Sequence, residues 1–168
     1  MTPDIGMTQA SRASACNVLR DTLATLMVAS VHTRQAHWST TGPNFSGLHA
    51  LYGSQYDEID QEIDLIAERI RALGEQPLRG PIRSLLDESE INDGTFLPTS
   101  IGNIKHGDWA DIARRVLSDN EVISKCLREY IEELEGKAIE DCASAQILLD
   151  MLIHHDKQCW LLRSHLEG

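Results

Sequence analysis

Four residues between positions 37 and 68 carry side chains that bind transition metals: His37, His49, Asp64 and Glu68. Imidazole and carboxylate ligands together suit Fe(II), Mn(II) or Zn(II). Asp64 and Glu68 are four residues apart, which is about one helical turn, so their carboxylates share one face of a helix. His37 and His49 flank a turn that contains Gly42, so a tight hairpin could bring them together. The pattern predicts metal binding through two imidazoles and two carboxylates.

The spacing does not allow all four residues of one chain to bind one ion. His49 and Asp64 are fifteen residues apart, which is about 22 Å along a helix, whereas metal–ligand bonds are about 2 Å. Either the chain has two separate sites, or a second chain completes one. An antiparallel pairing across a two-fold axis would place His37 and His49 of one chain opposite Asp64 and Glu68 of the other.

Simpler interpretations of the same residues exist. An acidic stripe along a helix is usually a solvated surface, and a histidine at the end of an apolar stripe, like His37, is more often a core residue than a ligand. His49 would then be an ordinary surface residue. The residue pattern alone therefore leaves a metal site and a solvated helical face as alternatives.

Four long segments with helical periodicity must position these side chains. They span residues 11–38, 45–73, 108–135 and 139–166. Within each segment the apolar residues recur at steps of three and four, which is typical of one buried helical face. Gly74 and Pro77 end the second segment, and Asn44 is a candidate N-cap at its start.

Residues 75–106 form a long connection with three prolines and three glycines, and residues 82–90 within it are compatible with a short helix. A connection of this length indicates that the chain crosses from one end of a bundle to the other. We therefore predict an all-α, ferritin-like four-helix bundle over residues 11–168, with a short extra helix between helices two and three. Residues 1–10 are predicted to be a short flexible tail.

Charge and composition limit the partners. The formal net charge is −11, and the first ten residues contain no lysine, so binding to DNA or to anionic lipid is disfavoured and binding of cations is favoured. We expect neither a signal peptide nor a membrane span. The four cysteines, at positions 16, 126, 142 and 159, form no Cys-x-x-Cys pair and are expected to be free, reduced thiols in a cytoplasmic protein.

Ferritin-like proteins that bind two metals inside the bundle use Glu-x-x-His on facing helices. The chain contains no Glu-x-x-His. An intra-bundle di-iron centre is therefore not expected, which favours the site shared between chains.

The metal-binding segment resembles the Dps family (DNA-binding protein from starved cells), also called mini-ferritins. The matching residues are Gln35-Ala36-His37-Trp38, Gly42, Asn44-Phe45, His49, Asp64, Ala67-Glu68-Arg69, Leu73-Gly74 and, near the end of the chain, Asp156 to Trp160. The resemblance covers roughly residues 15–166. It implies a hollow shell of twelve subunits, with a short helix in the long connection of each bundle.

The resemblance also implies a ferroxidase centre between two-fold related subunits, built from His37 and His49 of one and Asp64 and Glu68 of the other. Its substrate is Fe(II), which family members oxidise to Fe(III), preferring hydrogen peroxide to oxygen, before they store ferric mineral. Trp38 would lie near the centre and act as a radical sink; the alternative is a plain packing residue.

One position departs from the family. Many members carry Asp or Glu four residues after the second histidine, where this chain has Gly53. The second iron position is then expected to be weak, or to depend on Asp57, Asp60 or water.

Other polar residues have weaker predictions. Glu140 and Asp141, at the start of the fourth predicted helix, are candidates for an iron pore, and helix capping is the favoured alternative. His154 with Asp150 is a candidate minor metal site, and His155 is expected to be a core residue. His32, His106 and His165 show no readable pattern.

Together these observations predict an iron-oxidising and iron-storing mini-ferritin that protects a bacterial cytoplasm or nucleoid from oxidative stress. The first alternative is a DNA-compacting structural protein of stationary phase, which the lysine-free tail disfavours. A shell without redox activity is the second alternative.

Overall fold

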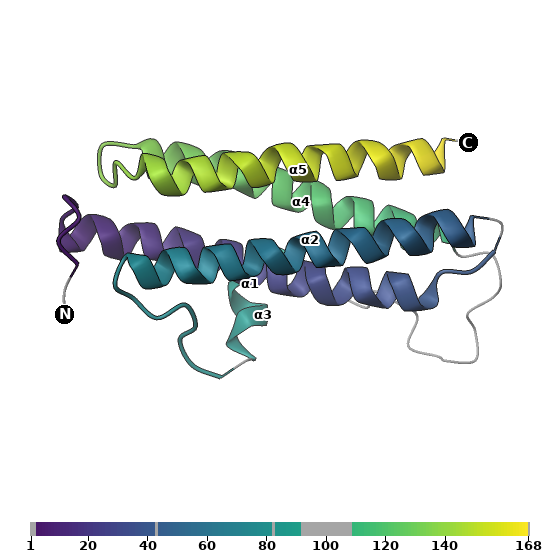
Figure 1. Ribbon diagram of the computed structural model, residues 1–168, viewed down its shortest axis with the longest axis horizontal. Helices are drawn as coiled ribbons and strands as arrows, with labels where there is room; N and C mark the ends of the chain where they lie inside the picture. The colour runs from purple at the N-terminus through teal and green to yellow at the C-terminus, as the bar shows by residue number, and fades with distance from the viewer. Residues whose placement is uncertain (1–2, 43, 82, 92–108, 168) are drawn as a thin grey trace.

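The computed structural model describes residues 3–42, 44–81, 83–91 and 109–167. Over these residues it contains α1 (Gln9–Ser39), α2 (Phe45–Ala72), the short α3 (Ser84–Glu88), α4 (Trp109–Glu135) and α5 (Cys142–Leu166). The four long helices form a bundle, and α3 lies against α1 (Figure 1). The predicted all-α bundle with a short helix in its long connection is confirmed.

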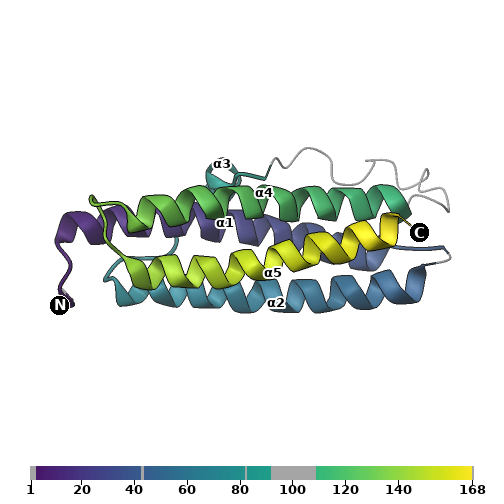
Figure 2. The same ribbon diagram turned by 90° about the horizontal axis from the view of Figure 1, so that it is seen from above.

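Two antiparallel hairpins, α1–α2 and α4–α5, make up the bundle, and α1 packs on α4 while α2 packs on α5 (Figure 2). Gly42, in the α1–α2 turn, lies beside Trp109 at the start of α4, because a Cβ on Gly42 would be 3.5 Å from Trp109 Cδ1. After α2 the chain must therefore return along the whole bundle before α4 begins. The predicted crossover is confirmed.

Local hydrogen bonds explain the helix ends. Thr8 accepts a hydrogen bond from the Ser11 amide and caps α1, so α1 begins inside the segment predicted as a tail. At the end of α2, Gly74 has φ of 94° and its amide bonds to the Arg71 carbonyl, while the Glu75 amide bonds to the Ile70 carbonyl. These two hydrogen bonds, around a glycine in the left-handed backbone conformation, form a Schellman motif. The motif confirms the predicted stop at Gly74.

α5 begins at Cys142, later than the start predicted at residue 139. Asp141 is the N-cap, and its carboxylate accepts a hydrogen bond from the Ser144 amide. Arg69 of α2 donates to both carboxylate oxygens of Asp141, at 2.8 and 3.1 Å. Asp141 is only 3% exposed, so its carboxylate is committed to capping and pairing, as the favoured alternative to a pore predicts. Glu140 has φ of 55° and precedes the helix.

The core consists of two apolar clusters with a polar layer between them. The larger cluster surrounds Leu23 and Ile123, and the smaller one surrounds Tyr52 and Leu162. Along each helix, buried polar residues separate the positions of the two clusters. They are Ser30, His32, Thr33, Gln55, Asp119, Asn120, His155 and Gln158. Buried polar groups are costly unless they are hydrogen-bonded, so the contacts inside this layer constrain how the helices pack.

Membrane insertion receives no support from the helices. Within the described residues, none of them combines the length and the apolar composition that a membrane span requires.

We expect Asp141→Ala to lower the free energy of unfolding by about 3 kcal/mol, because it removes a helix cap and leaves a partly buried arginine unpaired. Urea denaturation followed by circular dichroism, at fixed protein concentration, measures the change. Glu121→Gln is the matched control, since it breaks an ion pair with Arg163 whose partners are 37% and 49% exposed, and exposed pairs contribute at most about 1 kcal/mol. Equal losses in both variants would contradict this account of the α2–α5 junction.

Candidate metal centres

His37, in the last turn of α1, and His49, in the second turn of α2, lie against each other. Their ring centroids are 3.7 Å apart with an interplanar angle of 21°. His37 Nδ1 is 2.8 Å from the His49 carbonyl oxygen, and His49 Nδ1 is 2.9 Å from the His37 carbonyl oxygen. A carbonyl oxygen only accepts, so each Nδ1 must carry the proton and each neutral ring keeps its lone pair at Nε2. This arrangement sets both rings in the tautomer that binds a metal through Nε2.

Neighbouring groups hold the two rings in place. Phe45 stacks on His49, with centroids 5.0 Å apart, and Tyr56 meets the His37 ring edge-on at 5.3 Å. The Arg34 guanidinium lies over the Tyr56 ring, 4.6 Å from its centroid. Aromatic stacking and the cation–π contact restrict ring rotation, so the pair is preorganised within one chain.

Asp60 is already engaged elsewhere. Its carboxylate accepts hydrogen bonds from Ser30, at 2.8 Å, and from Arg34. Burial acts to raise the pKa of Asp60, but the bonds from Arg34 and Ser30 outweigh it and lower the pKa. Asp60 therefore serves the arginine that supports Tyr56, which disfavours it as a substitute ligand for a second iron.

Gly53 packs against the His37 ring. A Cβ at this position would be 3.4 Å from His37 Cε1 and 3.6 Å from Nδ1, which is ordinary van der Waals contact. The glycine thus lies where a carboxylate side chain would project beside the first imidazole.

Asp64 and Glu68 are exposed on α2, one turn apart. The structure brings His37 and His49 together and does not bring these carboxylates to them, as the helix-length estimate requires for a single chain. Completion of the site by a second chain stays a prediction. Trp38 is 72% exposed, and its predicted place beside iron stays a prediction too.

A second cluster, not predicted from the sequence, lies between α2 and α5. It consists of Glu62, His154 and His155, whose ligand atoms all lie within 4.8 Å of one another. Glu62 Oε1 is 2.7 Å from His154 Nδ1, and Glu62 Oε2 is 3.0 Å from His155 Nε2. Among the described residues, this is the one group of three or more histidine, cysteine or acidic side chains arranged to hold an ion.

The cluster lies inside the bundle, and contacts among its members shift the pKa values of Glu62 and His154. The side chain of His155 is fully buried, and those of Glu62 and His154 are 12% and 21% exposed. Burial acts to raise the pKa of Glu62, but hydrogen bonds from His154 and His155 lower it to about 2. Burial acts to lower the pKa of His154, but Glu62 and Glu58 raise it. The Glu62 carboxylate is therefore ionised at neutral pH, and its negative charge can bind a cation.

One sequence prediction about this region needs correction. The proposed pairing of His154 with Asp150 is wrong, because Asp150 accepts a hydrogen bond from Gln146 and His154 contacts Glu62 and Glu58 instead. His155 is a buried core residue, as predicted, but it belongs to a polar network. The missed signal was Glu58 and Glu62, one turn apart on α2.

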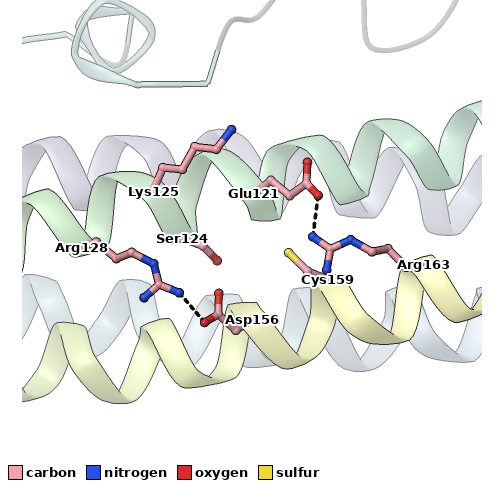
Figure 3. A pocket seen from close by; sticks show the side chains of 7 residues that line it. All are labelled: Glu121, Ser124, Lys125, Arg128, Asp156, Cys159 and Arg163. Atoms are coloured by element: carbon pink, nitrogen blue, oxygen red, sulfur yellow. Dashed lines mark hydrogen bonds and ion pairs between the residues drawn. The ribbon is translucent and has the colours of Figure 1, made fainter.

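A cavity between α4 and α5 does not provide a metal site (Figure 3). Its volume is about 390 Å³, and two ion pairs cross it, Arg163 with Glu121 at 2.6 Å and Arg128 with Asp156 at 2.7 Å. These pairs neutralise the carboxylates. Burial raises the pKa of the Cys159 thiol in its wall to about 11, so this sulfur is not a thiolate ligand at neutral pH.

Comparisons with known proteins agree with the bundle. Residues 16–168 match the ferritin-like domain family. An uncharacterized low temperature-induced protein of Nostoc is 29% identical over 98% of this chain and 87% of its own length. The DNA protection during starvation protein 2 of Bacillus anthracis is 27% identical over 89% and 94%. The crystal structure of Dps from Staphylococcus aureus superposes with a TM-score of 0.79, 27% identity and coverage of 96% and 98%.

Proposed function

This chain belongs to the ferritin-like family and its homologues include Dps proteins, and from that premise we propose that it is a mini-ferritin that oxidises Fe(II) and stores ferric iron. The observation that carries the proposal is the reciprocal His37–His49 pair. Two imidazoles with fixed Nδ1 protons and lone pairs at Nε2 are half of a metal centre. Fe(II) is the substrate here, and the carboxylates of Asp64 and Glu68 are the remaining ligands.

The second half of the centre comes from another copy of the chain. A two-fold axis that pairs α2 with its counterpart brings Asp64 and Glu68 of one subunit to the histidines of the other and creates two equal sites. Exposed apolar side chains on α1 and α3 are further surface that favours association between subunits, since Val31 is 53% and Leu86 46% exposed. The complete assembly would be a hollow dodecamer in a bacterial cytoplasm.

The chemistry is a two-electron reduction of hydrogen peroxide. Two Fe(II) ions each give one electron, the O–O bond breaks, and two protons complete two water molecules, leaving two Fe(III) ions. Because both electrons are delivered at the centre, no hydroxyl radical is released. The net charge of −11 attracts cations to the shell. Trp38 follows His37 directly in the sequence and would donate an electron if the second iron is missing.

DNA compaction is the weaker candidate. DNA binding depends on lysine and arginine contacts to phosphate, and the chain has four lysines, none in its first ten residues. Protection of a cell would then come from removal of Fe(II) and peroxide rather than from coating the chromosome.

The double variant Asp64→Asn/Glu68→Gln should lower the initial rate of peroxide-dependent Fe(II) oxidation by about tenfold or more, because the shared centre loses both carboxylates. His37→Gln should do the same from the other half of the site. Glu132→Gln, an exposed carboxylate on α4, is the control and should leave the rate unchanged. Wild-type rates in an assembled Asp64→Asn/Glu68→Gln shell would overturn the proposal.

Gly53→Asp should strengthen the second iron position, because the added Cβ fits beside the His37 ring and carries a carboxylate into this region. Anaerobic Fe(II) titration of the wild type should give one tight iron per centre, and the variant should give two. Gly53→Asn has the same shape without the charge and should resemble the wild type. Two tight irons in the wild type would show that Gly53 does not weaken the site.

The protein should not retard plasmid DNA in a gel-shift assay at neutral pH and moderate salt, because its charge opposes phosphate. A variant with several lysines added to the first ten residues is the positive control. Retardation of plasmid by the unmodified protein would favour the DNA-compacting alternative.

A further inference from the structure

We propose that Glu62, His154 and His155 form a second metal site, contained within one chain, that binds a divalent transition-metal ion such as Co(II), Zn(II) or Fe(II). This site is separate from the shared centre of the proposed function and requires no partner subunit. Two imidazoles and one carboxylate are the donor set that non-haem Fe(II) and related ions take, with positions left open for water.

The three side chains converge from two helices onto one point. Glu62 of α2 faces both histidines of α5, with its two oxygens 2.7 Å from His154 Nδ1 and 3.0 Å from His155 Nε2. Metal–ligand bonds of about 2.1 Å at right angles separate neighbouring ligand atoms by about 3 Å. All three ligand atoms lie within 4.8 Å of one another, so an ion can replace the protons between them with small side-chain movements.

The far nitrogen of His155 is held by a specific partner. Asn120 Nδ2 donates to the Val116 carbonyl at 2.8 Å, which turns Asn120 Oδ1 toward His155 Nδ1, 2.7 Å away. An amide oxygen only accepts, so Nδ1 of His155 must carry a proton. The Nε2 atom of His155, 3.0 Å from Glu62 Oε2, is therefore left to hold either a second proton or a metal ion between the ring and the carboxylate.

His154 has the matching arrangement. Its Nδ1 faces Glu62, and its Nε2 is hydrogen-bonded to the carboxylate of Glu58, which also accepts from Gln158 at 2.9 Å. Metal-binding histidines usually donate their other N–H to a carboxylate or carbonyl oxygen, which fixes the ring and raises its basicity. Both histidines of this cluster have that second partner.

The site is also accessible and carries the right charge. A cavity of about 250 Å³, lined by Glu58, Gln61, Glu62, Leu65 and His154, opens beside it. With both histidines neutral, Glu58 and Glu62 contribute two negative charges, which one divalent ion balances. In the absence of metal, protons must supply that charge, and the cluster is then an ion-pair network that only stabilises the fold.

Co(II) titration of the assembled, chelator-treated full chain distinguishes these roles. The background removes all four ligands of the shared centre (His37→Gln/His49→Gln/Asp64→Asn/Glu68→Gln), so that neither Co(II) binding there nor the failure of the proposed function affects the result. Absorption bands of Co(II) report the binding. We expect about one Co(II) per chain, and we expect His154→Gln or Glu62→Gln in this background to weaken binding by about tenfold or more. Asp150→Asn, one turn from His154, is the matched control and should leave binding unchanged.

X-ray absorption of Co(II) bound to the background protein identifies the ligand atoms directly, without a substitution in the cluster of Glu62, His154 and His155. Scattering from two imidazoles would support the proposal. Ligation by oxygen alone, no Co(II) bound by the folded shell, or unchanged binding in both His154→Gln and Glu62→Gln would overturn it and leave the cluster as an ion-pair network.

Discussion

The ionised carboxylate of Glu62, held between two imidazoles in the middle of the bundle, is the constraint on which the packing of α2 against α5 depends. A buried charge is costly unless partners surround it, and removal of one partner costs more than the pair contributes. The contacts of Glu62 with His154 and His155 therefore favour one alignment of α2 and α5. Arg69 with Asp141 fixes the same alignment at one end of α2.

Because α2 is one continuous helix, this alignment also determines where its other faces point. His49 and Gly53 lie against α1, Glu58 and Glu62 lie against α5, and Asp64 and Glu68 remain exposed. A helix turns by about 100° per residue, so three faces with different chemistry fit along one element. The contacts that stabilise the bundle and the proposed iron ligands are thus distributed over one continuous helix.

Local patterns predicted most of the fold. Apolar periodicity gave the four long helices, and glycine at position 74 marked the end of α2, because these signals reside in neighbouring residues. The turn between α1 and α2 likewise predicted that His37 and His49 meet. The ligand distance limit indicated correctly that one chain does not add Asp64 and Glu68 to them.

The cluster of Glu62, His154 and His155 could not be predicted in the same way, because its ligands are 92 and 93 residues apart and no local motif joins them. Only the packing of α2 on α5 brings them together. The Glu-x-x-His motif joins two ligands on one helix, whereas this cluster joins side chains of two helices. The start of α5 was placed too early because Asp141 caps the helix from outside, a role that helical periodicity does not reveal.

The crossed hydrogen bonds of His37 and His49 tie each imidazole to the backbone of the other helix. A slip of α2 by one residue would turn the His49 carbonyl by about 100° and break both bonds together. Both contacts therefore form only when α1 and α2 are in the correct register. Only then do the two rings present their Nε2 atoms to the proposed centre. In the proposed centre, each monomer would complete this half before it meets another, and assembly would add only the two carboxylates.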